Sequence, residues 1–313
     1  MFEIVRYTAD KAEEWNHFVA GSKNGTFLFD RHYMDYHADR FHDHSLMFYD
    51  ERGLYALLPA NDAEDGVLYS HKGLTYGGLV TDSRATANGV CILFQELKAC
   101  LLSLGFHKVI YKPVPWIYHR LPSEEDLYAL FLQGARLIGR DISSTIIPSA
   151  NLKWSHGRKY AADKARKCGI VVEQSEDYAA FWCILTDNLQ RRHGVKPVHS
   201  LDEIQLLHSR FPENIRLYVA RCGDEIIGGT VLYLCGQVVH AQYISATEKG
   251  KRLHAIDALY EQILKQDYAD APFFDFGKST VANGYELNES LAFQKEGFGG
   301  RGLCYDTYEW TLC

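Results

Sequence analysis

The chain has 313 residues, of which 47% are hydrophobic and 23% are charged, and its formal net charge is −7 at pH 7. This length suggests about two domains, and the composition is typical of a globular protein rather than of a disordered or fibrous one. The negative balance excludes a chain that binds polyanions over its whole surface. We expect no membrane span, because no apolar run reaches the roughly 18 to 20 residues that a span requires.

The first half begins with an alternating strand at residues 2–7 and a helix at residues 11–20. From residue 45 to residue 115 the pattern then predicts strand, turn, strand, polar loop, strand, amphipathic helix and strand. The helix of this unit is expected at residues 90–104, and the last strand at residues 108–111.

The second half begins after Pro148-Ser149-Ala150, which we interpret as the seam between two domains. A basic helix is expected at residues 157–167, and a long helix from Asp177 to about Arg192. Ser200 and Glu203 have the spacing of a capping box, which predicts that another helix begins there.

The pattern of the first half returns between residues 215 and 280, again with two paired strands, a third strand, a helix and a last strand. The two copies share order and spacing but little identity. This indicates a duplicated α/β (α+β) unit, with domains at residues 1–150 and 151–313. A duplicated unit of this kind creates a cleft between its halves, where we expect ligands to bind.

The segment from Phe274 to Thr280 reads Phe-Asp-Phe-Gly-Lys-Ser-Thr, and a predicted helix after it ends near Lys-Glu-Gly-Phe-Gly. This order resembles the C-terminal signature of FemABX-like proteins, and residues 191–201 and 155–169 also resemble segments of that group. The resemblance implies two tandem GNAT-like (acyl-CoA N-acyltransferase) domains, each a mixed, twisted sheet flanked by helices. It covers most of the chain and is specific in the second half.

Many GNAT enzymes hold the pyrophosphate of coenzyme A with a loop of two glycines at the start of a helix. The corresponding loop here has one glycine, Gly250, followed by Lys251 and Arg252, and we take these three as candidate cofactor-binding residues. FemABX-like enzymes commonly use an aminoacyl-tRNA instead. The resemblance therefore leaves the donor open between acyl-CoA and aminoacyl-tRNA, with no tightly bound cofactor.

Three residues are candidates for catalysis. Lys278 follows the predicted strand at 273–276, and a cation at a strand end could stabilise the oxyanion formed when an amine attacks an ester or thioester. His193 lies in a basic loop and is a candidate general base. Tyr243 lies in a strand, where it could protonate a leaving group. The alternatives are a solvated loop cation for Lys278, a solvated helix C-terminus for His193 and core packing for Tyr243.

Four more residues are candidates for substrate binding. Tyr76 is flanked by Gly73, Gly77 and Gly78, and His71 lies just before it, which suggests close approach of a ligand or of another backbone. Arg158 lies in the basic helix at the domain seam, and Arg191 lies beside His193. The alternatives are a solvated helix face for Arg158 and a solvated helix C-terminus for Arg191.

Together these features favour an N-acyltransferase that transfers an acyl or aminoacyl group to an amine of a cell-envelope precursor or amino sugar. No activated Cys or Ser pattern is present, so we expect direct attack without a covalent enzyme intermediate. The alternative is a non-catalytic ligand-binding module on the same duplicated fold.

The eight cysteines form no zinc pattern, and we expect reduced thiols, a cytoplasmic protein, no metal and no DNA partner. The oligomeric state does not follow from the sequence.

Overall fold

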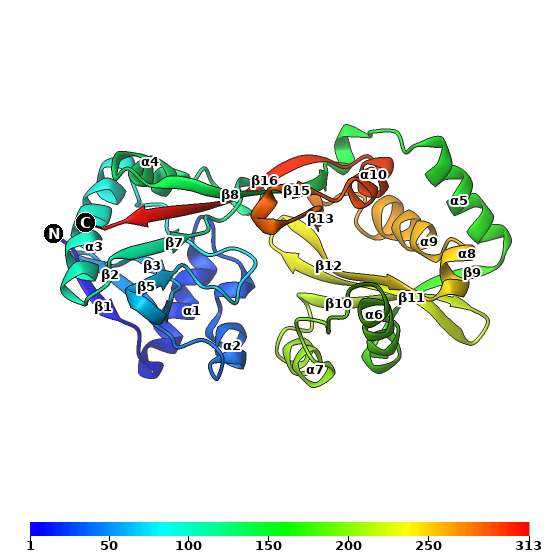
Figure 1. The fold of residues 1–313 in the computed structure, drawn as a ribbon, viewed down its shortest axis with the longest axis horizontal. Coiled ribbons are helices and arrows are strands. Elements are labelled where there is room, and N and C mark those ends of the chain that lie inside the picture. Colours follow the sequence, from blue (N-terminus) through cyan, green and yellow to red (C-terminus); the bar gives the residue numbers. More distant parts are fainter. Residues whose placement is uncertain (313) are drawn as a thin grey trace. The chain divides into compact units, whose positions relative to one another are not determined.

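The structure is a computed structural model that describes residues 1–312, and the side chain of His193 lies outside this description. The chain divides into two compact units, which are coloured along the sequence in Figure 1. Unit 1 contains Met1–Ile142, Thr280–Glu286 and Cys304–Cys313, and unit 2 contains Ser143–Ser279 and Leu287–Leu303. The expected domains, 1–150 and 151–313, differ from these units because residues 143–150 belong to unit 2, and because the segment Thr280–Glu286 and the last strand of the chain return to unit 1.

Unit 1 contains an antiparallel sheet in the order β1-β2-β3-β6 and a second group of strands in the order β4-β5-β7-β16. The strands of unit 1 include β1 (Glu3–Arg6), β2 (Leu46–Asp50), β3 (Gly53–Leu58), β4 (Asn61–Ala63), β5 (Val67–Tyr69), β6 (Val80–Thr81), β7 (Lys108–Tyr111), the first part of β8 (Arg136–Ile146), up to Ile142, and most of β16 (Arg301–Thr311). Its helices are α1 (Ala12–Gly21), α2 (Arg31–Met34), α3 (Ala87–Ser103) and α4 (Glu125–Leu132).

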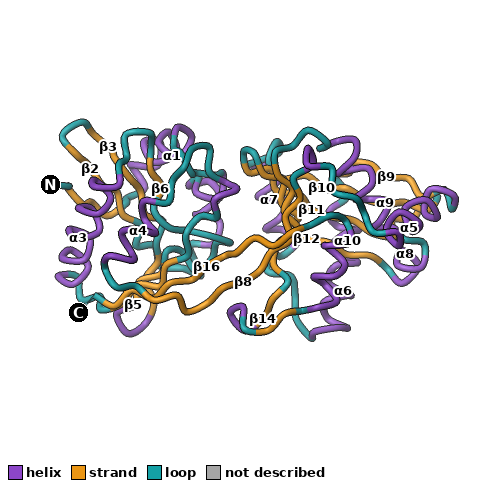
Figure 2. The backbone as a smooth tube through the Cα atoms, turned by 90° about the horizontal axis from the view of Figure 1, so that it is seen from above, coloured by secondary structure: helices purple, strands orange, loops and turns teal. Residues whose placement is uncertain are grey.

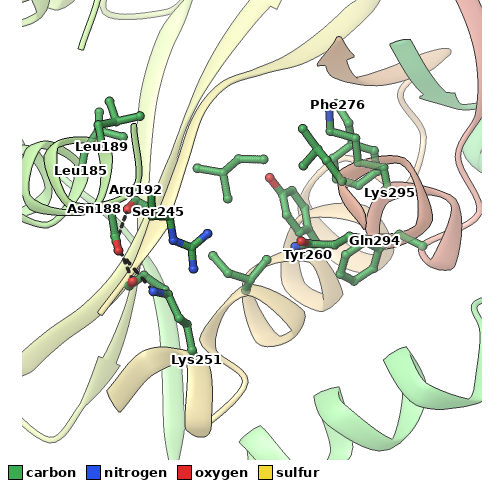
Figure 3. A pocket seen from close by; sticks show the side chains of 15 residues that line it. Leu185, Asn188, Leu189, Arg192, Ser245, Lys251, Tyr260, Phe276, Gln294 and Lys295 are labelled. Atoms are coloured by element: carbon green, nitrogen blue, oxygen red, sulfur yellow. Dashed lines mark hydrogen bonds between the residues drawn. The ribbon is translucent and has the colours of Figure 1, made fainter. Parts of the chain in front are cut away.

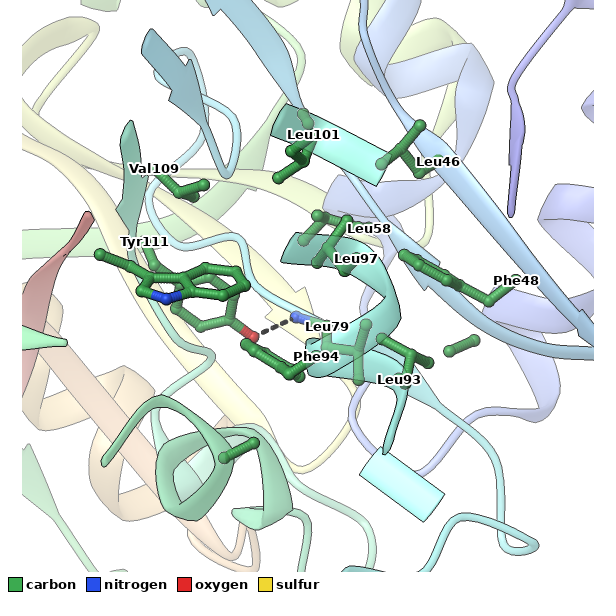
Figure 4. Close-up of a cluster of buried hydrophobic side chains, with 14 of the residues drawn as sticks. Leu46, Phe48, Leu58, Leu79, Leu93, Phe94, Leu97, Leu101, Val109 and Tyr111 are labelled. Carbon is green, nitrogen blue, oxygen red and sulfur yellow. Dashed lines mark hydrogen bonds between the residues drawn. The ribbon is translucent and has the colours of Figure 1, made fainter. Parts of the chain in front are cut away.

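The core of unit 1 is built around α3 (Figure 4). The hydroxyl of Thr86 accepts a hydrogen bond from the N–H of Gly89 and so caps the helix. The buried side chains of α3 recur every three or four residues, which places them on one face: Val90, Leu93, Phe94, Leu97 and Leu101. This spacing explains why the helix was predictable from the sequence.

Unit 2 has strands in the order β8-β13-β12-β11-β10-β9. They are the end of β8, from Ser143 onward, and β9 (Ile170–Ser175), β10 (Ile215–Cys222), β11 (Glu225–Cys235), β12 (Val238–Ala246) and β13 (Phe273–Lys278). The helices are α5 (His156–Lys167), α6 (Tyr178–His193), α7 (Leu201–Arg210), α8 (Glu248–Arg252), α9 (Ala255–Gln262) and α10 (Glu289–Gly297). A short ribbon, β14 (Thr280–Val281) with β15 (Glu286–Leu287), precedes α10 in the chain and belongs to unit 1 as far as Glu286. Within unit 2, α6 and α7 cover one face of the sheet and α5 and α9 lie over the other (Figures 1 and 2).

The expected repetition is present in the topology. In unit 1 the parallel strands β5 and β7 are joined through α3, and in unit 2 the parallel strands β12 and β13 are joined through α8 and α9. Each half therefore contains one parallel pair with a helical crossover, preceded by antiparallel strands.

None of the helices within residues 1–312 is both long enough and apolar enough to cross a membrane.

The pairing of β12 with β13 is short, and this positions the site. The two strands pair only from Val238↔Phe273 to His240↔Asp275, although β12 continues to Ala246 and β13 to Lys278. Beyond His240 the strands part, and their far ends can be filled by side chains from neighbouring helices.

Candidate active site

A cavity of about 300 Å³ lies inside unit 2, at the far ends of β12 and β13. Its walls also include side chains from α6, α8, α9 and α10 (Figure 3). Much of the lining is apolar and aromatic, including Leu185, Ile244, Tyr260 and Phe276. Burial raises the pKa of Tyr260, so this phenol stays protonated and forms a neutral wall.

The charged side chains among the described residues that line the cavity are cations, and one of them, Lys251, also pairs with Glu248 outside the lining. Arg192 and Lys251 lie on one side and Lys295 on the other, and no Asp or Glu is among the described residues that line it (Figure 3). The Nδ2 atom of Asn188 donates to the hydroxyl of Ser245 over 2.7 Å, and its Oδ1 atom accepts from Lys251 over 3.2 Å. An apolar cavity with a cationic rim suits a ligand that carries both an anionic group and an apolar one.

Lys295 is the most unusual of these residues, because it is a lysine with only 4% of its surface exposed. Its Nζ atom donates to the carbonyl oxygens of Gly277 and Lys278, each over 2.7 Å. Burial lowers the pKa of Lys295 to about 8, and the charge of Asp275 acts in the opposite direction. An ammonium has three N–H donors, so one remains for the cavity.

We did not predict Lys295 from the sequence. A signal for it exists, because Leu291, Lys295 and Phe298 are spaced by four and three residues and therefore share one face of α10. All three line the cavity. A lysine between two apolar residues on one helix face could have been noticed.

Lys278, the predicted oxyanion donor, ends β13 with an exposed side chain and is not among the residues that line the cavity. Its backbone carbonyl is the part that reaches the site, since it accepts a hydrogen bond from Lys295. The strand end was therefore located from the sequence, while the lysine side chain that lines the cavity at this strand end comes from α10.

Tyr243 and His193, the other two catalytic candidates, are placed differently. The hydroxyl of Tyr243 lies 2.5 Å from Nδ1 of His199, and its ring packs edge-on against Trp182 at 5.1 Å. Tyr243 thus ties the segment after α6 to β12 and does not line the cavity. His193 is the last residue of α6, and its side chain lies outside the described part of the chain.

The two arginines proposed for substrate binding both form ion pairs. Arg191 is exposed and pairs with Asp187 over 2.8 Å, whereas its neighbour Arg192 lines the cavity. Arg158 pairs with the buried Asp257 over 2.8 Å, and its guanidinium lies 4.9 Å from the centre of the Phe298 ring. Arg158 therefore reaches the cavity only through Phe298, which forms part of the wall.

The loop proposed to bind a cofactor contributes one of its three residues. Lys251 lines the cavity, and Arg252 is exposed and lies outside it. Gly250 is buried, and a Cβ atom there would lie 2.0 Å from the carbonyl oxygen of Ile227. Its N–H donates to the hydroxyl of Thr247 over 3.0 Å, so this glycine serves the cap of α8 and close packing against β11.

Tyr76 and His71 belong to unit 1 and lie in its interior. The hydroxyl of Tyr76 donates to Thr26 over 3.1 Å. A Cβ atom at Gly77 would lie 1.6 Å from the carbonyl oxygen of Ser70, so the close approach suggested by these glycines is to another backbone. His71 has a φ of +64°, and burial, followed by the nearby His37, lowers its pKa to about 3.

Comparison with known proteins places this geometry in context. Residues 156–285 match the family model of an acetyltransferase (GNAT) domain. A comparison with curated proteins gave no match. This family match includes the parted strands, α6, α8 and α9, and it confirms the predicted class of enzyme, an acyltransferase of the GNAT type.

Solved structures resemble the chain over its whole length. The structure of FemX has a TM-score of 0.68 and 11% identity, with 99% of this chain and 97% of that chain covered. L-PGS from Bacillus licheniformis has a TM-score of 0.61 and 14% identity, with 98% and 93% covered. A tandem GNAT protein from the clavulanic acid biosynthesis pathway has a TM-score of 0.53 and 10% identity, with 100% and 99% covered. The chain therefore has the tandem GNAT fold of FemX-like proteins and carries, at residues 156–285, the domain of the GNAT acyltransferases.

Proposed function

We propose that the protein transfers an acyl or aminoacyl group to an amine of a cell-envelope precursor or amino sugar, in the cavity of unit 2. The observation that carries this proposal is the buried ammonium of Lys295, which lines the cavity together with Arg192 and Lys251, while no carboxylate is among the described lining residues. Such a site favours negative charge that develops inside it. Negative charge develops on the carbonyl oxygen when an amine attacks an ester or thioester.

The proposed reaction is a direct attack. The amine lone pair forms a bond to the carbonyl carbon, and the carbonyl oxygen becomes an oxyanion that accepts the remaining N–H of Lys295. When the carbonyl re-forms, the bond to the thiolate or alkoxide breaks, and the proton lost by the amine balances the charge of the leaving group. We keep His193, or a water molecule, as the proposed carrier of that proton.

The cationic rim supports a donor with a phosphate group. Arg192 and Lys251 lie across the cavity from Lys295, so a donor held by its phosphate at the rim could extend its acyl group toward the ammonium (Figure 3). Acyl-CoA and aminoacyl-tRNA both carry phosphate groups and an activated acyl group. The GNAT match favours acyl-CoA as the first donor to test, and the FemX-like fold makes aminoacyl-tRNA the second.

The proposed location of the reaction is the cytoplasm, where both donors are made. The cysteines in the described part of the chain are free thiols, which supports a reducing compartment. The acceptor is then a precursor amine that is present before export.

The test is a transfer assay with defined donors and acceptors. Purified protein is mixed with acetyl-CoA or with a mixture of aminoacyl-tRNAs, and glucosamine and a lysine-containing peptide serve as acceptors. We expect mass spectrometry to detect an amide product with one donor class, and the intact protein to keep its mass because no acyl-enzyme forms. Binding of a donor without any product, for both donor classes and all acceptors, would instead identify a non-catalytic binding module.

A further inference from the structure

A buried polar cluster around Asp275, whose charge acts on Lys295, is not part of the cavity wall. Asp275 is 0% exposed, accepts hydrogen bonds from Ser143 over 2.5 Å and Thr145 over 2.9 Å, and lies 2.9 Å from Nδ1 of His240. These residues come from β8, β12 and β13, in which His240 and Thr145 are both register partners of Asp275. Burying a carboxylate in a sheet interior is costly, which points to a role of Asp275 beyond packing.

The strand that carries Asp275 bulges immediately after it. From Asp275 to Lys278, β13 advances three residues while its partner β8 advances only from Thr145 to Ser143. Gly277, inside this bulge, has a φ of +74°, which favours glycine. A Cβ atom at Gly277 would lie 3.3 Å from Cε1 of His240, so the bulge packs against the imidazole ring.

The bulge also holds Lys295. The two carbonyl oxygens that accept hydrogen bonds from its Nζ atom belong to Gly277 and Lys278, both in the bulged segment. The ring of His240, fixed by Asp275, therefore supports the backbone that fixes the ammonium. A loss of this support would leave Lys295 in place on α10 but would change the direction of its remaining N–H.

We propose that His240 and Asp275 are positioning residues for Lys295, which act by shaping the Gly277 bulge and by supplying a negative charge behind the ammonium. This inference rests on the proposed function, because it gives Lys295 the task of stabilising the oxyanion. Neither His240 nor Asp275 lines the cavity, so neither contacts the substrate there.

The electrostatics agree with this geometry. Burial lowers the pKa of Lys295, and the carboxylate of Asp275 raises it. The other charged side chains among the described lining residues, Arg192 and Lys251, are cations on the opposite side, and Lys251 is paired with Glu248. The imidazole of His240 lies against the carboxylate. Loss of the Asp275 charge therefore leaves the ammonium without this support, and the amine then loses its proton at a lower pH.

The experiment observes Lys295 directly and requires no substrate. The full-length protein is labelled with 15N-lysine, the Nζ resonance of Lys295 is assigned by its loss in Lys295→Met, and its titration midpoint is measured from pH 6 to pH 11. We expect a midpoint near the pKa of about 8 in the unaltered protein. In Asp275→Asn, which keeps the shape of the side chain, the midpoint falls by about one pH unit.

Thr145→Val is the matched control, because it removes one hydrogen bond of the same cluster but leaves the carboxylate. We expect its midpoint to stay within a few tenths of a pH unit of the original. An unchanged midpoint in Asp275→Asn, or an equal fall in Thr145→Val, overturns the electrostatic part of the proposal.

His240→Ala tests the support of the bulge and serves if Asp275→Asn fails to fold. We expect the N–H groups of Lys295 to exchange with water at least about tenfold faster in this variant, because their carbonyl partners shift. Exchange at the original rate overturns the positioning role. In a transfer assay, Asp275→Asn lowers kcat, leaves KM unchanged and moves the alkaline fall in activity to lower pH. Full activity of Lys295→Met, in contrast, removes the oxyanion role proposed for Lys295 and leaves the positioning result intact.

Discussion

The Nζ atom of Lys295 lies 2.7 Å from the backbone carbonyl oxygen of Lys278. Lys278, which the sequence indicated at the strand end, contributes its backbone carbonyl to this bond. Lys295, which lines the cavity, contributes its side chain. A substitution at residue 278 keeps that carbonyl, whereas a substitution at residue 295 removes the ammonium. The two positions form a matched pair for experiments.

The rim of the cavity predicts a difference between two adjacent arginines. Arg192→Ala and Lys251→Ala should each raise the KM for a phosphate-bearing donor by about fivefold, because each removes one charge-assisted contact at a partly solvated site. Arg191→Ala is the control, since Arg191 is exposed and pairs with Asp187. Initial rates at varied donor concentration check this, and the difference should shrink as salt is added. Equal effects at residues 191 and 192 would count against a donor site at this rim.

Burial of Lys295 predicts how stability depends on pH. Its pKa is about 8 in the folded protein, compared with the ordinary value of 10.5. Below pH 8 both states hold the proton, and the buried charge costs up to about 3 kcal/mol. Between pH 8 and pH 10.5 the unfolded state binds more protons, so the contribution of this residue to stability rises with pH.

Lys295→Met lacks this titration. The unfolding free energy of the unaltered protein, minus that of Lys295→Met, should therefore rise by up to about 3 kcal/mol from pH 7 to pH 10.5. Urea denaturation at both values measures it, with the exposed Lys278→Met as the comparison. A difference that stays flat with pH would show that Lys295 is not buried as described.

Gly250 should matter for folding rather than for ligand contact. Gly250→Ala places a methyl group 2.0 Å from the carbonyl oxygen of Ile227, so we expect a loss of about 1–3 kcal/mol in unfolding free energy. Gly157, in the first turn of α5, has nothing within 4 Å of its added Cβ atom, and Gly157→Ala should stabilise the protein by about 0.5–1 kcal/mol. Chemical denaturation of both variants tests the contrast. If Gly250→Ala kept its unfolding free energy but bound the donor more weakly, the result would favour the cofactor-binding role that the sequence suggested for Gly250.

The ion pair of Arg158 with Asp257 predicts a coupled loss of stability. Arg158→Met keeps the apolar stem near Phe298 but leaves the buried carboxylate without its guanidinium, so we expect a cost of about 1–3 kcal/mol. The double variant with Asp257→Asn should cost less than the two single changes together. Denaturation of the four proteins completes this cycle. Additive costs, with a raised KM for substrate, would favour the binding role that the sequence suggested for Arg158.

Much of the fold follows from local patterns. The capping box at Ser200 and Glu203 is present at the start of α7, and the side chain of Asp177 caps α6 as its position suggested. The partners of the strands, in contrast, do not follow from local patterns. β16 pairs with β7 through Tyr308↔Tyr111, and this pairing depends on the path of the whole chain.

The site was predictable in its location and less so in its residues. The sequence around Lys278 marks a strand end that does lie at the cavity, yet a buried lysine on α10 runs against the usual exposure of lysine. Its burial depends on two carbonyl oxygens that only the bulge of β13 presents. Similarly, the glycines beside Tyr76 indicated a close approach, and whether to a ligand or to a backbone required the structure.

The most direct measurement compares the turnover of Lys295→Met and Lys278→Met with the donor and acceptor found in the transfer assay. Loss of an oxyanion donor costs about 10²–10³ in kcat, so we predict a fall of that size for Lys295→Met, with Lys278→Met within about threefold of the unaltered protein. Turnover retained by Lys295→Met and lost by Lys278→Met would contradict the assignment of the oxyanion to the cavity ammonium.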